Sequence, residues 1–279
     1  MKGNGQLLKI WNRFNGLIFF HPQRWPHGEI LSRTTALLVV GAFLVNRFIQ
    51  FDQFPQTFAA TSAFYGAFRT VTGDPVYSNA AIAVVWGIKA LVWGLEIAVY
   101  FGYILAYIGR AKAVSVARGF METAYPVIIA GLPVLIFMAP YTLPTYVPVS
   151  SPRHVYFYVL ISLLIAVGGA VNLIGLLSLR KGFTIMTEAR VLITTGIFRY
   201  IRHPLYSGHF IIFLGSLLLR LHIYTVILYI AFLLGQLHRS RIEERKLRAI
   251  FPEHDRYRQF TGMFFPRFSG YKIKKMPEK

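Results

Sequence analysis

Long apolar runs alternate with shorter polar segments along this chain. The runs cover about residues 35–49, 79–108, 123–141, 155–177, 205–219 and 223–237. Because a transmembrane helix needs roughly 20 predominantly apolar residues, we predict six membrane helices, and the second is long enough to tilt or to project beyond the bilayer. The last two runs, of about 15 residues each, are short for a span. Only Arg220, Leu221 and His222 separate them, which predicts a tight helical hairpin.

Composition supports a membrane protein and narrows its chemistry. The chain is 55% hydrophobic and carries 24 Phe and 16 Tyr among 279 residues, while only 15% of its residues are charged. This is too much apolar surface for an ordinary soluble domain, so we expect an all-α, polytopic membrane protein. The chain has no cysteine. Disulfides, thiolate metal sites and a cysteine nucleophile are therefore excluded, and no metal site is expected.

The formal charge of +19 follows the predicted topology. If both termini are cytoplasmic, the inside segments hold 25 of the 30 Lys and Arg residues, and the outside segments hold three. The inside segments are then residues 1–34, 109–120, 179–204 and 238–279. This asymmetry is the positive-inside rule, so the charge needs no nucleic acid as a partner. Some of the basic residues are expected to contact the head groups of anionic membrane lipids.

The stretch RHPLYSG concentrates polar groups where the fifth apolar run begins. Proline favours the first position of a helix and keeps the residue before it out of the α region, so Pro204 should start a helix with His203 just before it. The positive end of that helix would lie beside Arg202 and His203, which predicts an anion site. Gly208 would permit the close approach of a ligand or of another helix. The alternative is that Arg202 and His203 only anchor the helix end at the membrane surface.

A second polar cluster follows the sixth run, in the stretch HRSRIEERKL. Arg239 and Glu243 are four residues apart and share one helical face, an arrangement that is commonly a plain surface ion pair. The hairpin changes this interpretation, because two helices joined by about three residues have neighbouring cytoplasmic ends. We therefore expect Arg202, His203 and Tyr206 to face Arg239 and Glu243 across one cavity.

These motifs resemble a known family. The order TTGIFRYIRHPLYSG, then RIEERKLRAIFPEHDRYRQF and PRF, is similar to the isoprenylcysteine carboxyl methyltransferase and phospholipid methyltransferase superfamily, over roughly residues 175–268. The preceding KGFTIMTEARVLITTG looks like its bacterial members, which implies a bacterial inner membrane. The resemblance implies that S-adenosylmethionine is the cofactor and that residues 121–279 form the methyltransferase core. Residues 1–120 would be an N-terminal region with an interfacial helix at residues 7–20 and two membrane helices.

The resemblance also assigns roles to individual residues. Arg239 would hold the carboxylate of the substrate, and Glu243 would bind the cofactor opposite the His-Pro-x-Tyr element. The cofactor-binding residues that the resemblance implies are Arg190, Val191, Leu192, Ile193, Phe198, His203, Pro204, Leu205, Tyr206, Glu243 and Glu244. Phe198 departs from the family pattern, which usually has Tyr there, so a hydroxyl contact is lost that Tyr200 could replace.

The acceptor of the methyl group is left open by the sequence. A lipophilic acceptor would enter from the bilayer. Carboxyl O-methylation of an isoprenylcysteine-type substrate needs no general base, because a carboxylate is already ionised at pH 7. Phospholipid N-methylation would require Glu243, Glu244 or His203 to accept a proton. The oligomeric state has no signal in the sequence.

Two other classes of protein compete with this interpretation. Membrane sterol and steroid reductases, which use NADPH, carry a similar Arg-His-Pro-x-Tyr element, although they typically have Asn where this chain has Leu205. A transporter or scaffold is suggested by Lys89 and Glu96 within the second apolar run, because ionisable residues inside membranes are costly and usually functional. The simpler interpretation is that Lys89 and Glu96 each bond to a neighbouring helix.

Overall fold

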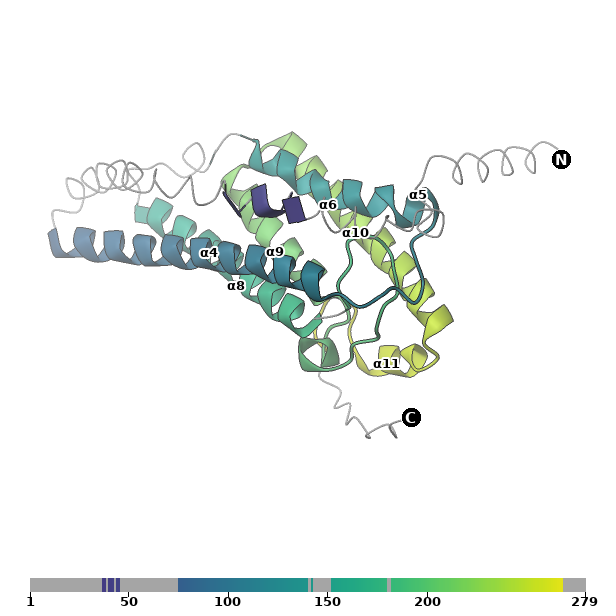
Figure 1. The fold of residues 1–279 in the computed structure, drawn as a ribbon. Coiled ribbons are helices and arrows are strands. Elements are labelled where there is room, and N and C mark those ends of the chain that lie inside the picture. Colours follow the sequence, from purple (N-terminus) through teal and green to yellow (C-terminus); the bar gives the residue numbers. More distant parts are fainter. Residues whose placement is uncertain are drawn as a thin grey trace, which may run out of the picture.

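A computed structural model describes residues 75–139, 142, 152–179 and 182–267, together with parts of residues 37–45. Over this part of the chain the secondary structure is helical, with two isolated β-bridges and no strand (Figure 1). The helices are α4 Pro75–Gly109, α5 Gly119–Glu122, α6 Ala124–Phe137, α8 Pro152–Leu179, the 3-10 helix η3 Gly196–Arg199, α9 Pro204–Leu219, α10 Ile223–Ile250 and α11 His254–Phe260.

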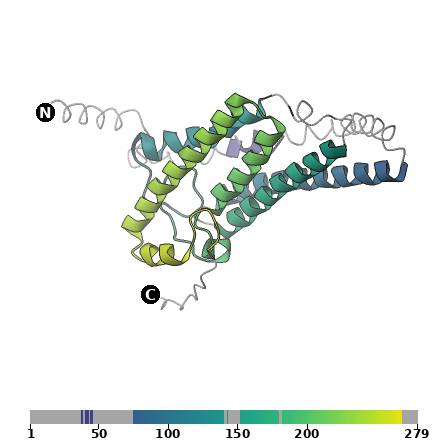
Figure 2. The same ribbon diagram turned by 180° about the vertical axis from the view of Figure 1, so that it is seen from behind.

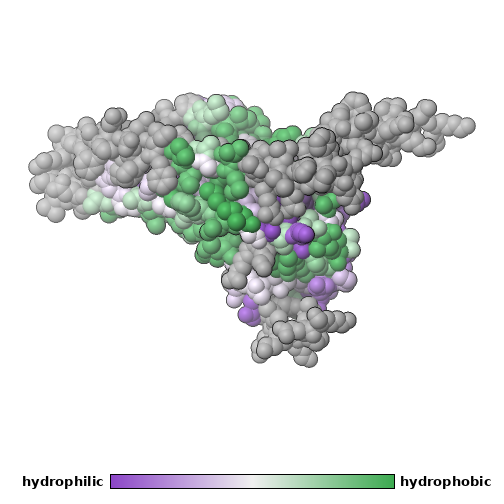
Figure 3. All heavy atoms as spheres, in the orientation of Figure 1, coloured by the Kyte–Doolittle hydropathy of each residue, from purple (hydrophilic) through white to green (hydrophobic). Residues whose placement is uncertain are grey.

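Three of these helices are long and apolar enough to cross a membrane: α4 over Ala83–Gly109, α8 over Tyr156–Leu179, and α10. The apolar helices α6 and α9 are shorter. Five of the six predicted runs are thus helices in the structure, whereas the first run lies largely outside the described residues. Figure 3 shows apolar surface mainly over the helices, with hydrophilic patches toward the end of the molecule that carries α11. Six membrane spans remain a prediction.

Helix α10 is longer than the apolar run that begins it. The run at 223–237 looked too short for a span, but α10 continues to Ile250 and has 28 residues. The reason is local: no Gly or Pro interrupts the chain between Leu237 and Ile250, and the helix ends just before Pro252. Arg239, Glu243 and Glu244 therefore lie on the same rigid helix as the apolar half of the hairpin.

Helices α8 and α9 pack closely, as the view from behind shows (Figure 2). Their crossing contains Gly168 and Gly208: a Cβ atom built on Gly208 would lie 2.8 Å from the Gly168 carbonyl oxygen and 2.9 Å from the Asn172 nitrogen. Small residues at such a crossing let two helix backbones approach within van der Waals contact. Of the two expectations for Gly208, the structure therefore shows the close approach of another helix.

Three polar segments that the sequence analysis assigned to the same membrane face meet in the structure: those after α4, after α8 and at the end of α10. Ser115 and Ala189 form an antiparallel bridge. Lys246 of α10 donates from Nζ to the carbonyl oxygens of Val116 at 2.7 Å and Thr187 at 2.8 Å, and pairs with Glu122 Oε2 at 2.6 Å. Parts of residues 109–120, 179–204 and 238–267 thus form one body at one end of the helices. Its cytoplasmic location remains a prediction.

Lys89 lies between two helices. Its Nζ is 5.4 Å from the ring centroid of Trp86 and 5.6 Å from that of Tyr158 on α8. These are cation–π distances. The contact with Tyr158 agrees with the simpler interpretation, in which Lys89 bonds to a neighbouring helix.

Candidate active site

A cavity of about 310 Å³ lies where the converging segments meet the ends of the helices. Ligand pockets for small molecules commonly have volumes of about 300–1,000 Å³. Its wall includes every residue that the sequence proposed for the site: Arg190, Val191, Leu192, Ile193, Phe198, His203, Pro204, Leu205, Tyr206, Arg239, Glu243 and Glu244. Residues from distant parts of the chain thus surround one space. Their individual roles remain predictions.

Residues 190–193 form an extended segment on the cavity wall. The backbone is fixed just before it, where the Ala189 carbonyl oxygen accepts hydrogen bonds from Val114 N at 2.8 Å and Ser115 N at 3.0 Å. The Arg190 guanidinium is occupied: Nη2 lies 2.6 Å from Glu188 Oε2, and Nη1 donates to the Ala111 carbonyl oxygen. Arg190 therefore ties the segment to its neighbours and offers the cavity little unpaired charge.

The His203–Pro204 element begins α9 as the sequence predicted. Pro204 is the first residue of the helix, and His203 has φ −123° and ψ 61°, outside the α region. The imidazole stacks on the Tyr206 ring with a centroid distance of 5.3 Å and an interplanar angle of 2°. The backbone nitrogen of His203 donates to Met263 O at 3.0 Å, and Ser207 Oγ donates to Phe264 O at 2.6 Å. The C-terminal segment thus holds this element in place.

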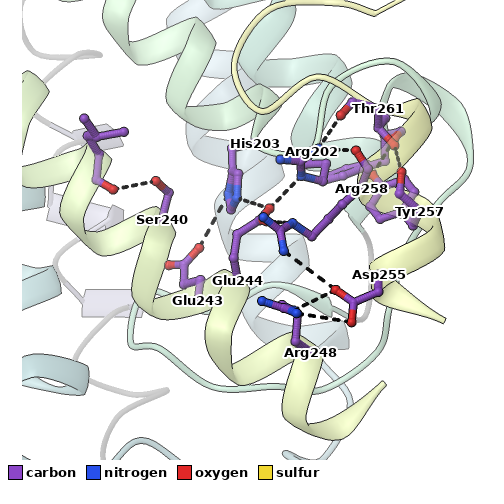
Figure 4. A network of polar contacts seen from close by, with 12 residues as sticks. Arg202, His203, Ser240, Glu243, Glu244, Arg248, Asp255, Tyr257, Arg258 and Thr261 are labelled. Carbon is purple, nitrogen blue, oxygen red and sulfur yellow. Dashed lines mark hydrogen bonds and ion pairs between the residues drawn. The ribbon is translucent and has the colours of Figure 1, made fainter. Parts of the chain in front are cut away.

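Glu244 is the centre of an ion-pair network, drawn in Figure 4. Its Oε1 lies 2.7 Å from Arg202 Nε and 3.1 Å from His203 Nε2, and its Oε2 lies 2.9 Å from Arg258 Nε. Arg202 also donates from Nη1 to the carbonyl oxygens of Arg258 and Thr261. The expectation that the Arg202 and His203 side chains bind an anionic ligand is therefore corrected: both already pair with Glu244 of the chain itself.

Glu243 shares His203 with its neighbour, with 3.7 Å from His203 Nδ1 to Glu243 Oε2, but its other contacts differ. Its Oε1 accepts hydrogen bonds from Tyr206 Oη at 2.5 Å and from Arg239 Nε at 3.1 Å. Its side chain is 20% exposed, against 7% for Glu244. Successive residues on a helix point about 100° apart. The two adjacent glutamates therefore serve different surroundings, and Glu243 belongs to the cavity wall together with Tyr206 and Arg239.

Arg239 is nearly enclosed but keeps donors available. Nη2 donates to the Ile185 carbonyl oxygen at 2.6 Å, and the guanidinium carbon lies 5.1 Å from the Tyr206 ring centroid. Its Nη1 makes no hydrogen bond to any residue in the described part of the chain. Because a guanidinium carries five N–H groups in a planar fork, Arg239 can hold Glu243 and still bind a further anion in the cavity.

The sequence interpretation missed two wall residues from the C-terminal stretch, His254 and Tyr257. Tyr257 Oη donates to the Phe198 carbonyl oxygen at 2.5 Å, and burial raises the pKa of Tyr257 above its usual value. Burial lowers the pKa of His254, which favours its neutral form. Tyr200 was named as a residue that could replace the hydroxyl missing at Phe198, but it is 41% exposed and lies off the wall. Tyr257 is the tyrosine that borders the cavity beside Phe198.

The sequence interpretation also missed one end of the cavity, which lies among the apolar helices. We call this the inner end. Six residues from four helices line it: Tyr103 of α4, Ala130 of α6, His209 and Phe213 of α9, and Phe232 and Gln236 of α10. The Phe213 and Phe232 rings meet edge to face at 5.0 Å. The sequence held one indication of this inner end: residues 232, 236, 239 and 243 are spaced so that they share one face of α10 with the proposed site residues.

Residues 159–249 match the family model described as Isoprenylcysteine carboxyl methyltransferase (ICMT) family. Over these residues the chain is similar to the ICMT family. The matched segment contains the extended segment 190–193, the His203–Tyr206 element and the Arg239–Glu244 cluster, so the resemblance in the sequence is confirmed. A family of methyltransferases implies an enzyme, and the long apolar helices together with this family indicate an integral membrane protein. No curated protein matches the chain significantly.

Several wall residues lie outside the ICMT match. Tyr103 and Ala130 precede it, and His254 and Tyr257 follow it. The cavity is therefore built partly by the ICMT segment and partly by helices that are added on either side of it.

Proposed function

We propose that this ICMT-family protein is an S-adenosylmethionine-dependent methyltransferase that methylates the carboxylate of an isoprenylcysteine-type, lipophilic acceptor. The observation that carries the proposal is the difference in polarity between the two ends of this cavity. One end holds His203, Arg239 and Glu243, and the inner end carries the apolar side chains of Phe213 and Phe232. An amphiphilic acceptor and a charged cofactor would each find a matching environment within one space.

The charged end suits the chemical groups of S-adenosylmethionine. When bound, this cofactor supplies an electrophilic methyl group on a positively charged sulfur. Glu243 would stabilise the cationic groups, beside the stacked rings of His203 and Tyr206. The first turn of α9 leaves backbone N–H groups without a partner in the helix, and these suit a carboxylate. Arg190 and Arg202 would act indirectly, by holding the wall segments in position.

Arg239 is the residue that we propose for binding the carboxylate of the acceptor. Its guanidinium is oriented by Glu243 and by the Ile185 carbonyl oxygen. A carboxylate held by the remaining donors needs no base, so alignment and the exclusion of water would supply the acceleration.

The surroundings of the two glutamates favour this acceptor over a lipid amine. An amine must lose a proton before it can attack, and the sequence offered Glu243, Glu244 and His203 as proton acceptors. Glu244 faces three cationic or potentially cationic side chains, and Glu243 accepts from Tyr206 and Arg239. An incoming amine would therefore have to compete with these groups for the oxygens of either carboxylate. An acceptor that is already ionised avoids this difficulty.

The test combines cofactor binding with methyl transfer, using purified protein in lipid nanodiscs. S-adenosylmethionine and NADPH are titrated separately, and transfer of a labelled methyl group is measured with a farnesylated cysteine analogue and with phosphatidylethanolamine. We expect binding of S-adenosylmethionine and transfer to the farnesylated acid. Binding of NADPH alone would refute the proposal, and transfer only to phosphatidylethanolamine would replace the carboxylate by an amine.

A variant of Arg239 tests its role in the same assay. Arg239→Lys keeps the charge but loses the planar fork, so transfer to the farnesylated acid should fall more than about tenfold while affinity for S-adenosylmethionine changes little. Arg241→Lys, at an exposed position on the same helix, is the matched control and should behave as wild type. Equal activity of both variants would remove Arg239 from acceptor binding.

A further inference from the structure

The inner end of the cavity is not purely apolar. Besides Ala130 and the two phenylalanines, it includes Tyr103, His209 and Gln236. A tail of hydrocarbon alone would need none of these polar groups. Their position between the charged end and the phenylalanines corresponds to the head of an amphiphile, next to the group that is methylated.

Gln236 is the most unusual of the three. It is 2% exposed, and its side-chain carbonyl oxygen accepts no hydrogen bond within the described part of the chain. Leaving a buried polar group unsatisfied costs about 1–3 kcal/mol, so such atoms are rare unless a ligand or a water molecule pairs with them. Gln236 lines the cavity, so a molecule bound there can supply a donor.

Gln236 lies close to Arg239 on the same face of α10. The two residues are three apart on one helical stripe, which corresponds to about 4.5 Å along the helix axis. One molecule could therefore contact both, with its carboxylate at Arg239 and a hydrogen-bond donor at Gln236. An N–H or O–H group on the carbon next to the carboxyl group would fit this separation.

His209 supports the same arrangement from α9. Its Nε2 lies 3.3 Å from Tyr103 Oη, and its ring stacks on Phe213 with a centroid distance of 5.7 Å. These two contacts fix the imidazole at the boundary between the polar and apolar residues of the inner end. Polar groups on α9 and α10 thus both border the region where the acceptor's head would lie.

We propose that Gln236 determines specificity by accepting a hydrogen bond from an N–H or O–H group that lies one carbon from the acceptor's carboxylate. This inference rests on the proposed function. It assigns the acceptor to the N-acylated amino acids and hydroxy acids with a lipophilic chain, and it disfavours simple fatty or prenylated acids that have no such donor.

Two acids that differ in one group test this. N-acetyl-S-farnesylcysteine carries the N–H donor, whereas 3-(farnesylthio)propanoic acid has the same chain and carboxylate without it. The dissociation constant of each is measured with the protein in nanodiscs, and kcat/KM for methyl transfer is measured in parallel. We expect wild type to prefer the N-acetyl compound by about tenfold in both measurements, which is the effect of one hydrogen bond.

Gln236→Met keeps the volume of the side chain and removes the amide, so it should abolish the preference by weakening only the N-acetyl compound. Gln259→Met makes the same change at an exposed position on α11 and should keep the preference. If Gln236→Met does not fold, Gln236→Asn, whose amide is withdrawn by one methylene, should show the same loss.

Equal binding of the two acids by wild type, or an equal loss for both in the Gln236 variant, would overturn the inference. Methyl transfer to neither acid would instead count against the proposed function. In that case the binding preference still decides the role of Gln236.

Discussion

Replacing each of the two adjacent glutamates by glutamine should separate a structural carboxylate from a ligand-binding one. Glu244→Gln removes the charge that faces Arg202 and His203, whose side chains are only 10% and 8% exposed. Breaking a buried ion pair from one side costs about 3–5 kcal/mol. Arg202 keeps the carbonyl oxygens of Arg258 and Thr261 as acceptors, so we expect the lower end, a loss of about 3 kcal/mol in the free energy of unfolding.

Glu243→Gln should have the opposite profile. The new amide oxygen can still accept from Tyr206 and Arg239, and the side chain is partly exposed, so the free energy of unfolding should fall by only about 1 kcal/mol. The lost charge faces the cavity. Affinity for S-adenosylmethionine should therefore weaken by about 1–3 kcal/mol, which is roughly 5-fold to 150-fold.

The assay measures both quantities on the same preparations. Unfolding is followed in one lipid or detergent system without cofactor, and the affinity for S-adenosylmethionine is measured by calorimetry on the folded protein. Glu244→Gln should be the less stable variant and Glu243→Gln the weaker binder. If both variants lose stability equally and bind equally well, the distinction between the two glutamates is refuted.

Three further changes test other parts of the structure. Gly208→Ala should lower the free energy of unfolding by about 1–3 kcal/mol through overpacking of the α8–α9 crossing, whereas Gly94→Ala, where a Cβ atom has open space, should not destabilise the protein. Burial lowers the pKa of His254, so the folded state resists protonation of this side chain. The contribution of His254 to stability is therefore complete above about pH 6.5 and is lost as the pH falls. When unfolding is measured between about pH 7 and pH 5, the stability of His254→Gln should depend less on pH than that of wild type. Single cysteines at the exposed positions Val191 and Leu221 should be labelled from opposite sides of the membrane, and labelling of both from the same side would contradict the proposed topology.

Local patterns in the sequence were sufficient to predict where the apolar helices lie and at which residue α9 begins. Apolar runs predicted the positions of α4, α6, α8, α9 and α10, because a segment of that length and composition is stable in a membrane only as a helix or a closed barrel. Proline at position 204 predicted the helix start for a reason that is contained in its own ring. The short connection after Leu219 requires the two halves of the hairpin to be neighbours, so the polar ends of α9 and α10, near Tyr206 and Glu243, were predicted to lie side by side.

The partners of the charged side chains were decided by the tertiary structure. Arg202 looked available for an anionic ligand, yet Glu244, 42 residues later, neutralises it. Glu243 and Glu244 are the same residue type at adjacent positions, so no local pattern distinguishes them. The difference arises because the helix directs Glu243 toward Tyr206 on α9 and Glu244 toward Arg258 on α11, a segment that packs there only in the folded chain.

The inner end depends on tertiary structure even more strongly. Tyr103, His209 and Gln236 lie 106 and 27 residues apart along the chain, and each reads in the sequence as a single polar residue within an apolar helix. The packing of α4, α9 and α10 makes them neighbours on one wall. Apolar periodicity specifies that these helices form and which faces are buried, but the contact between two buried polar groups depends on the relative rotation and depth of the helices, which packing alone sets.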